Sequence, residues 1–255
     1  MIIRMTIFSI VLSVFTLNAQ CISSDKIKYG GVWSGVDYIF YCPTYEFAFN
    51  GDNSKDWNKA MGPIDINFVG SQIFPLKGKI ELIIKGFAGN EFYRNITFSS
   101  VDIVYPDSLE NFKDSSPSCD MKKCKAKYFL NYVYSPMKDA KYIFGIAVSK
   151  DWKILNKFNF PSKKYFQAVD TSLSICRIVK IAESFKNKIL PIQSIRFDFD
   201  PKDNKFYWIV EQEALEDGNQ VLHDLYIDAS NCRRTKFVNR YVSVESYKAL
   251  EVEDK

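Results

Sequence analysis

Residues 127–134 (KYFLNYVY) and 142–149 (YIFGIAVS) are two short runs of aromatic and β-branched residues with a polar stretch between them. Side chains of these types favour strands, and runs of this length broken by Gly, Pro, Asn or Asp are typical of sheets rather than helices. Ser149-Lys150-Asp151-Trp152 then predicts a hairpin turn before the next run. The stretch therefore predicts neighbouring strands of an antiparallel sheet.

Similar runs come earlier in the chain: VWSGVDYIFY (32–41), PIDINFV (63–69), KIELIIKGF (79–87) and FYRNITFSSVDIVY (92–105). Ile64-Ile66-Phe68 and Ile80-Leu82-Ile84 alternate with other residues, which indicates strands with one face on a core and one face in water. We therefore expect residues 25–160 to form an antiparallel β domain of six to eight strands. Residues 105–127 are polar and rich in turn residues, and are expected to form a long surface loop.

The pattern changes after Pro161. Five apolar residues spaced three and four apart predict an amphipathic helix: Ile175, Ile178, Val179, Ala182 and Phe185. Thr171 or Ser172 is the expected N-cap, and Pro191 lies beyond the expected end. Three strand-like runs follow, QSIRFDFD (193–200), KFYWIVEQEA (205–214) and VLHDLYIDA (221–229).

The predicted fold class is therefore α+β. A mainly antiparallel β domain precedes a small helix-plus-antiparallel-sheet domain at residues 171–245, with residues 161–170 as a linker and residues 246–255 as a polar C-terminal tail.

The first twenty residues have the pattern of an export signal. Arg4 precedes an apolar run from Met5 to Leu17, and the chain becomes polar at Asn18-Ala19-Gln20. An apolar run of this length is too short for a membrane-spanning helix, which needs roughly 20 residues, but suits a signal peptide. We therefore expect an exported protein, periplasmic or secreted, with residues 1–20 as its signal peptide and no transmembrane segment in the mature chain.

Six cysteines remain after the predicted signal peptide: Cys21, Cys42, Cys119, Cys124, Cys176 and Cys232. An even number in an exported chain indicates disulfides, and the sequence alone leaves their pairing open. Cys119 and Cys124 are the best local candidate pair. Cys21 directly follows the predicted signal peptide, so lipidation there is an alternative, although Gln20 stands where lipoproteins have a small residue.

Composition and motifs exclude several classes of protein. The chain is 47% hydrophobic with 11 Gly and 9 Pro, which excludes disordered and collagen-like structure. A net charge of +4 is mild for nucleic-acid binding, so no nucleic-acid partner is expected. His223 is the single histidine, and no nucleophile elbow, phosphate loop or dinucleotide fingerprint occurs. We therefore predict no catalytic residue, no metal site and no cofactor.

Two short motifs near the C-terminus carry a family resemblance. Tyr207-Trp208, Val210-Glu211 and the later Tyr226-x-Asp228-Ala229 resemble the PepSY family, small α+β modules of exported bacterial proteins, over about residues 170–240. Ser230-Asn231-Cys232 departs from the family, which usually has a glycine in this turn. Asn tolerates the left-handed backbone that glycine supplies, and Asp228 is suited to accept amides in an Asx-turn. Asp228 and Asn231 are therefore predicted to be structural.

These observations favour a non-enzymatic binding or interaction module of the bacterial envelope, with an envelope protein or a peptide as its partner. The edge of the C-terminal sheet could accept an extended peptide by strand addition. A carboxylate-using hydrolase on the β domain is one alternative, and peptidase inhibition, which the PepSY resemblance implies, is another. The sequence does not determine the oligomeric state.

Overall fold

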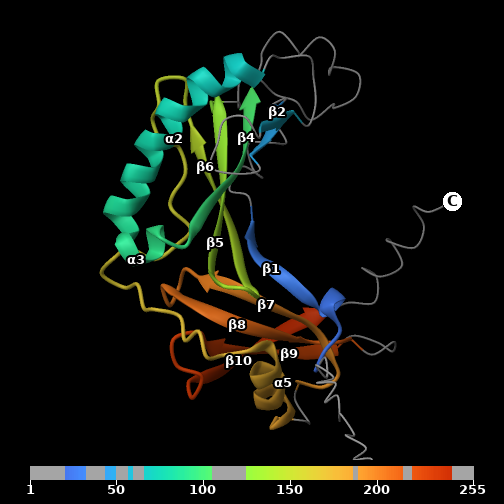
Figure 1. Ribbon diagram of the computed structural model, residues 1–255. Coiled ribbons are helices and arrows are strands. Elements are labelled where there is room, and N and C mark those ends of the chain that lie inside the picture. The colour runs from blue at the N-terminus through green and yellow to red at the C-terminus, as the bar shows by residue number, and fades with distance from the viewer. Residues whose placement is uncertain are drawn as a thin grey trace, which may run out of the picture.

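Ten strands lie side by side in the order β10-β9-β8-β7-β1-β6-β5-β4-β2-β3 (Figure 1). The structure is a computed structural model and describes residues 21–32, 44–49, 57–59, 66–104, 125–185, 189–214 and 220–242. The predicted signal peptide, the C-terminal tail, nearly all of the predicted loop at 105–127 and all but Val32 of the run at 32–41 lie outside these residues. The chain is thus a mixed α/β protein with a large sheet and few helices.

The elements fall into two halves on either side of β1 (Ile27–Val32), which follows a short 3-10 helix at Ser24–Lys26. The N-terminal half contains β2 (Thr44–Phe49), β3 (Trp57–Lys59), α2 (Ile66–Ala88), α3 (Asn90–Tyr93), β4 (Ile96–Val104), β5 (Tyr128–Met137) and β6 (Ala140–Val148). The C-terminal half contains α5 (Ile175–Glu183), β7 (Ile192–Asp200), β8 (Lys205–Gln212), β9 (Gln220–Asp228) and β10 (Thr235–Val242).

Strand β1 connects the two halves. Its first three residues pair with β7 and its last three with β6, and both pairings are parallel. Gly30 and Gly31 lie where the strand passes from one partner to the other. A Cβ on Gly30 would lie 1.8 Å from the carbonyl oxygen of Phe197, and Gly31 has a φ of +74°. Glycine permits both the close approach and the left-handed backbone. The sheet is therefore mainly antiparallel, as predicted, but mixed, because both pairings of β1 are parallel.

One hydrophobic core extends through both halves. It contains residues of α2, β4, β5 and β6 together with residues of α5, β7, β8 and β9. Phe206 of β8 lies at the contact, with its ring centroid 5.0 Å from that of Tyr134 and 5.3 Å from that of Tyr142. Aromatic pairs at such distances stabilise a core beyond the area that they bury.

Helix α2 replaces two predicted strands. The runs at 63–69 and 79–87 were expected to be extended, but residues 66–88 form one helix. Its buried side chains are three and four residues apart, at Val69, Ile73, Leu76, Ile80, Ile84 and Ala88. Ile80 and Ile84 are fully buried while Leu82 is 71% exposed, so the alternation Ile80-Leu82-Ile84 was part of a helical period. In the run at 92–105, Phe92 and Tyr93 belong to α3, and the strand begins at Ile96.

The C-terminal half has the predicted helix and the three predicted strands, and a fourth strand, β10, that was not predicted. The predicted N-cap is wrong by two or three residues: Ser174 caps α5, and its side chain accepts a hydrogen bond from the amide of Arg177. Ser172 instead bonds to Asp170. Strand β10 pairs with β9 over eight residues without a register shift.

The segment between β6 and α5 packs against both halves. The predicted turn at residues 149–152 is present, and a single bridge, Val148 to Ile154, follows it. The chain then passes α3 and descends to α5 (Figure 1). The amide of Lys163 donates to Phe87 of the N-terminal half, and the amide of Asp170 donates to Ala229 of the C-terminal half. The predicted linker at 161–170 is therefore bonded at both ends.

None of the described helices is both long enough and apolar enough to cross a membrane.

Candidate functional site

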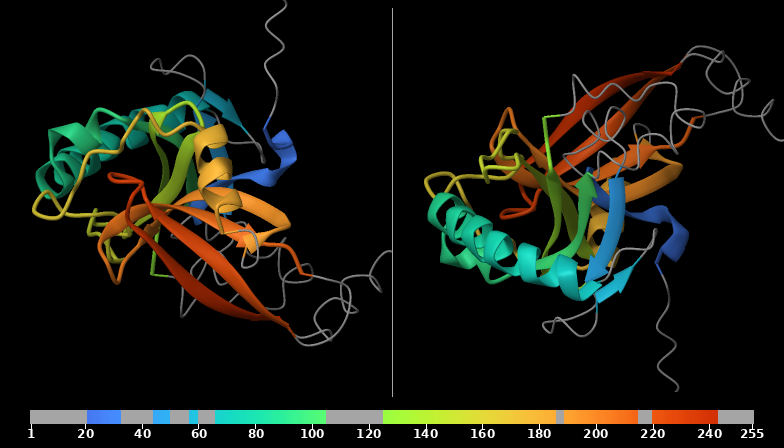
Figure 2. Two further views of the ribbon diagram at one scale, coloured as in Figure 1. Left: turned by 90° about the horizontal axis from the view of Figure 1, so that it is seen from below. Right: turned by 90° about the horizontal axis from the view of Figure 1, so that it is seen from above.

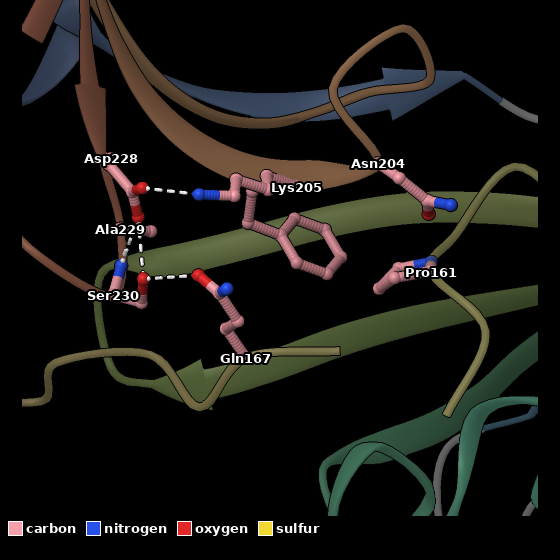
Figure 3. Close-up of a pocket in the computed structure, with 8 residues that line it drawn as sticks. Pro161, Gln167, Asn204, Lys205, Asp228, Ala229 and Ser230 are labelled. Atoms are coloured by element: carbon pink, nitrogen blue, oxygen red, sulfur yellow. Dashed lines mark hydrogen bonds and ion pairs between the residues drawn. The ribbon is translucent and has the colours of Figure 1, made fainter. Parts of the chain in front are cut away.

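A small pocket lies where β8 begins and β9 ends, beside the predicted Asx-turn after Asp228 (Figure 3). Lys205 Nζ lies 3.0 Å from Asp228 Oδ2, and the amide of Ser230 donates to Asp228 Oδ1 over 2.9 Å. The Ser230 hydroxyl lies 2.6 Å from the same oxygen and 2.9 Å from Gln167 Oε1. The cavity volume of the pocket is about 10 Å³, whereas ligand pockets usually enclose roughly 300–1,000 Å³. The side chains of Lys205, Asp228, Ser230 and Gln167 bind one another. The pocket is therefore a contact between the turn after Asp228 and the segment at 161–170.

The carboxyl of Asp228 is ionised at this contact. Burial opposes its ionisation, but the hydrogen bonds from Ser230 and the ion pair with Lys205 outweigh burial and hold its pKa below the usual value. The backbone oxygen of Asn231 accepts the amide of Arg234, and its side chain accepts the amide of Arg233. Asn231 is not among the described residues with positive φ, so the expectation of a left-handed residue there is wrong.

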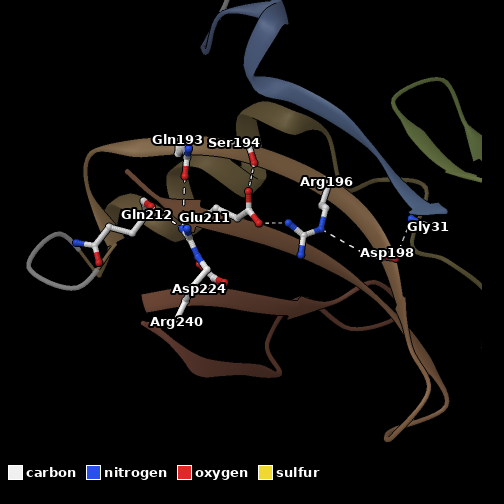
Figure 4. Close-up of polar contacts among 9 residues, drawn as sticks. All are labelled: Gly31, Gln193, Ser194, Arg196, Asp198, Glu211, Gln212, Asp224 and Arg240. Carbon is white, nitrogen blue, oxygen red and sulfur yellow. Dashed lines mark hydrogen bonds and ion pairs between the residues drawn. The ribbon is translucent and has the colours of Figure 1, made fainter. Parts of the chain in front are cut away.

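The face of the C-terminal half away from α5 carries a network of charges (Figure 4). The amide of Gly31 donates to Asp198 over 3.0 Å, and Arg196 bridges Asp198 and Glu211. Ser194 also donates to Glu211. The network thus ties β1 to β7 and β8.

A second group of contacts on this face fixes β10. Arg240 contacts Asp224 of β9 over 3.3 Å, the carbonyl oxygen of Gln212 of β8 over 2.8 Å and Gln193 of β7 over 3.4 Å. Lys236 pairs with Asp200 and Asp203, and its ammonium lies 4.6 Å and 5.1 Å from the ring centroids of Tyr207 and Tyr226. These contacts hold β10 against the sheet through alternate side chains.

A general acid needs a carboxyl whose pKa is raised toward neutrality. An open groove beside the network brings together Asp25, Glu211 and Glu213. A hydrogen bond from Ser23 lowers the pKa of Asp25, and Glu211 is paired with Arg196. Hydrogen bonds also lower the pKa of Asp170 and Asp203. The pKa values of Asp25, Asp170, Asp203 and Asp228 all lie below the usual value, which is the opposite of what a general acid needs.

The run Asp198–Asn204 forms a strand end and a turn, in which Asn204 has a φ of 57°. The carboxylates of Asp200 and Asp203 both form ion pairs with Lys236, so they are already paired with a cation of the protein. Within the described ranges, no three His, Cys, Asp or Glu side chains are placed to hold a metal ion.

Cys21 forms a disulfide with Cys176, the second residue of α5. The bond uses the sulfur that lipidation would modify, so the two modifications of Cys21 exclude each other. Cys232 is a free thiol 3.5 Å from the guanidinium of Arg177. The candidate pair Cys119 and Cys124, like Cys42, lies outside the described residues. The Cys21–Cys176 bond joins residues 155 apart in sequence, and no local spacing could have identified it.

The side of β10 that faces away from β9 is the second feature that sequence reasoning missed. β10 is the last strand at one end of the sheet order, and the β9–β10 hairpin lies on the side of the molecule opposite α2 (Figure 2). The amide of Asp228 donates to Arg234, which fixes the phase of the ladder between the two strands. Because pairing alternates along an antiparallel ladder, the amides of Thr235, Phe237, Asn239 and Tyr241 point away from β9.

The side chains of these outward residues are only partly covered. Phe237 packs edge-on against Phe185 of the α5 end, with ring centroids 5.2 Å apart. His223 lies half-buried opposite Asn239, with Nδ1 3.0 Å from the Asn239 oxygen. Beyond them Tyr241 is 79% exposed and Val221, its partner on β9, is 49% exposed. An apolar strip therefore runs along the side of β10 that faces away from β9, and no other described strand pairs with that side.

Comparisons of the chain with protein-family models, with curated protein sequences and with solved structures found no match.

Proposed function

We propose that the protein is an exported, non-enzymatic binding module, and that its PepSY-like C-terminal half binds an extended polypeptide segment along β10. The observation that carries the proposal is an eight-residue edge strand that contains neither a proline nor a bulge. Proteins usually shield such edges with short strands, prolines, bulges or outward charges, because open amides and carbonyls pair with other chains. The opposite edge strand, β3, is only three residues long.

The contacts of Lys236 and Arg240 support the same proposal. Both side chains lie back over the sheet and are paired with carboxylates of β7, β9 and the β7–β8 turn. They therefore hold β10 in an extended conformation before a ligand arrives. A backbone that is ordered in advance lowers the entropic cost of binding.

The apolar strip indicates the chemistry of the ligand. A strand added to β10 would place every second side chain beside Phe237 and Tyr241, on the side of α5. The charges on the other face are already paired within the protein, so that face selects little for ligand charge. We expect an extended segment with apolar residues at alternate positions.

A fluorescent synthetic peptide that alternates valine and threonine tests the proposal by anisotropy. Asn239→Pro removes one outward amide while leaving the amides that pair with β9, and Asn239→Ala keeps the amide but loses the same side chain. We expect the Pro variant to bind at least about tenfold more weakly, from the lost hydrogen bond and the ring of proline, and the Ala variant to bind like the original chain.

Amide resonances of the unsubstituted chain provide a second measurement. Titration with the peptide should shift Thr235, Phe237, Asn239 and Tyr241 more than the residues between them. Equal binding by both Asn239 variants, or shifts centred on another element, would show that β10 is not the site. A peptide with prolines at alternate positions serves as the ligand control.

A further inference from the structure

Helix α2 exposes apolar residues as well as lysines on its outer face. The inner face supplies six fully buried residues to the core. The outer face exposes Pro75, Gly78, Leu82 and Gly86, and a Cβ added at either glycine would meet nothing within 4 Å. Surface helices normally carry polar residues outward, so this run of exposed apolar residues is unusual. In Figures 1 and 2, α2 forms the outside of the molecule.

Larger apolar side chains extend this face toward the end of the helix. Leu82 is 71% exposed, Ile83 36% and Phe87 37%. Tyr165, 50% exposed, is two residues beyond Lys163, whose amide donates to Phe87 over 2.7 Å. The ring of Phe87 is held by Phe158, 4.7 Å away between centroids. We call the surface formed by Leu82, Ile83, Phe87 and Tyr165 the α2 patch.

Lysines surround the α2 patch. Lys79 and Lys85 of the helix and Lys163 and Lys164 of the adjoining segment are all exposed. The one carboxylate of α2, Glu81, is half-buried and paired with Lys77 over 2.9 Å. Segment 161–166 contains no carboxylate, and on α3 the exposed Glu91 is followed by the exposed Arg94. The patch therefore presents exposed apolar side chains within a ring of positive charge.

We propose that the α2 patch rests on the surface of an anionic lipid bilayer. Apolar side chains that enter the headgroup region and lysines that face anionic headgroups are the two contributions to binding at such surfaces. A second copy of the chain fits less well, because a two-fold contact through α2 would bring the lysines of both copies together without carboxylates between them. The helix lies on the bilayer in this arrangement and does not cross it.

Vesicle flotation with the full chain tests the proposal. Vesicles of phosphatidylcholine alone are compared with vesicles in which part of it is replaced by phosphatidylglycerol. We expect binding to the anionic vesicles and little binding to the neutral ones. Each lysine near an anionic surface contributes about fivefold, so K163Q/K164Q should weaken binding by roughly twentyfold, and added salt should weaken it further.

Leu82→Glu tests the position of the contact, and Val221→Glu is its matched control. Both place one negative charge at an exposed apolar position, on α2 and on β9 respectively. We expect Leu82→Glu to reduce binding at least about tenfold and Val221→Glu to change it little.

Equal loss in the two variants, or no binding to anionic vesicles by the original chain, would overturn the proposal. A concentration-dependent dimer that Leu82→Glu disperses would overturn it in favour of self-association. Asn239→Pro should bind vesicles normally, so the outcome is independent of peptide binding at β10.

Discussion

The two halves of the sheet complete their faces differently. Beneath α2, the N-terminal half packs aromatic and aliphatic side chains, and on its other face Asn131 donates to Ser100 and Asp102, all three buried. The C-terminal half also packs an apolar face, against α5, but its other face carries six ion pairs, in which the carboxylates of Asp224 and Asp228 are buried and the other side chains are partly exposed. Loss of packing and loss of charge should therefore affect the two halves to different extents.

The connection between the halves is the point at which the largest effect is expected. Gly30→Ala would drive a methyl group into the carbonyl of Phe197, where the backbone of Phe197 and Asp198 leaves no room. We expect the folded state to lose about 3 kcal/mol or more, or not to form, measured by urea unfolding and near-ultraviolet circular dichroism.

Gly78→Ala is the matched control for this substitution. The same methyl group would meet nothing there, and alanine in a helix interior should stabilise the chain by about 0.5–1 kcal/mol. Similar behaviour of the two variants would mean that β1 does not pass between β7 and β6 as described.

The shared core is tested by Phe206→Ala. Phe206 is nearly buried and contacts rings of both halves, so its removal should cost about 3–5 kcal/mol. Because the core is common, both halves should unfold in one transition. Hydrogen exchange of the amides of β5 and of β8 measures whether they do. Two separate transitions would instead support the division into domains at residues 161–170. Phe237→Ala, at the half-buried edge, is expected to cost less.

Acid is expected to weaken the C-terminal half before the N-terminal half, with a smaller effect than the substitutions above. The pKa of Asp228 and of Asp203 is lower in the folded chain than the ordinary 3.8. Their ionised forms therefore stabilise the fold above that value, and this contribution disappears as pH falls through the folded-state pKa. In a local opening that precedes the common unfolding transition, the amides of β8 and β9 should lose exchange protection below about pH 4 before those of β5. Asp228→Asn should lower stability at neutral pH and weaken this acid dependence. Loss of protection in both halves at the same pH would mean that no such local opening occurs.

Two tyrosines of the N-terminal half should show the smallest effects. The hydroxyl of Tyr142 donates to the carbonyl oxygen of Asn159, whereas the buried hydroxyl of Tyr132 has no hydrogen-bond partner among the described residues. Tyr142→Phe should cost about 1 kcal/mol, and Tyr132→Phe should be neutral or slightly stabilising. The measurement is thermal unfolding of both variants. A clear loss in Tyr132→Phe would mean that its hydroxyl has a partner after all.

Local patterns in the sequence predicted much of the C-terminal half. Residues 195–200 alternate buried and half-buried side chains, residues 206–210 form a short run buried on both faces, and the spacing from Ile175 to Ala182 is that of a helix face. Helix α2 was missed because Ile80-Leu82-Ile84 also fits a strand, and because Pro75, Gly78 and Gly86 interrupt the longer period. β10 was missed because residues 235–242 contain few apolar residues among the polar ones, so they do not form an apolar run.

The candidate sites depend on contacts that a sequence does not show. The open edge at β10 follows from the order of the strands, and the α2 patch follows from the helix that was mistaken for strands. Likewise, nothing near Cys21 identifies Cys176 as its partner.

The position of β1 also affects the order in which the molecule can be assembled. Its partners are near residue 142 and residue 195, whereas β4, β5 and β6, and likewise β7 to β10, pair with strands next to them in sequence. A chain that emerges from its N-terminus carries this strand without its first partner until more than 110 further residues have followed, and without its second until more than 160 have followed. Until then, both half-sheets present an open edge, at β6 and at β7. The strand made first is thus the one that closes the sheet.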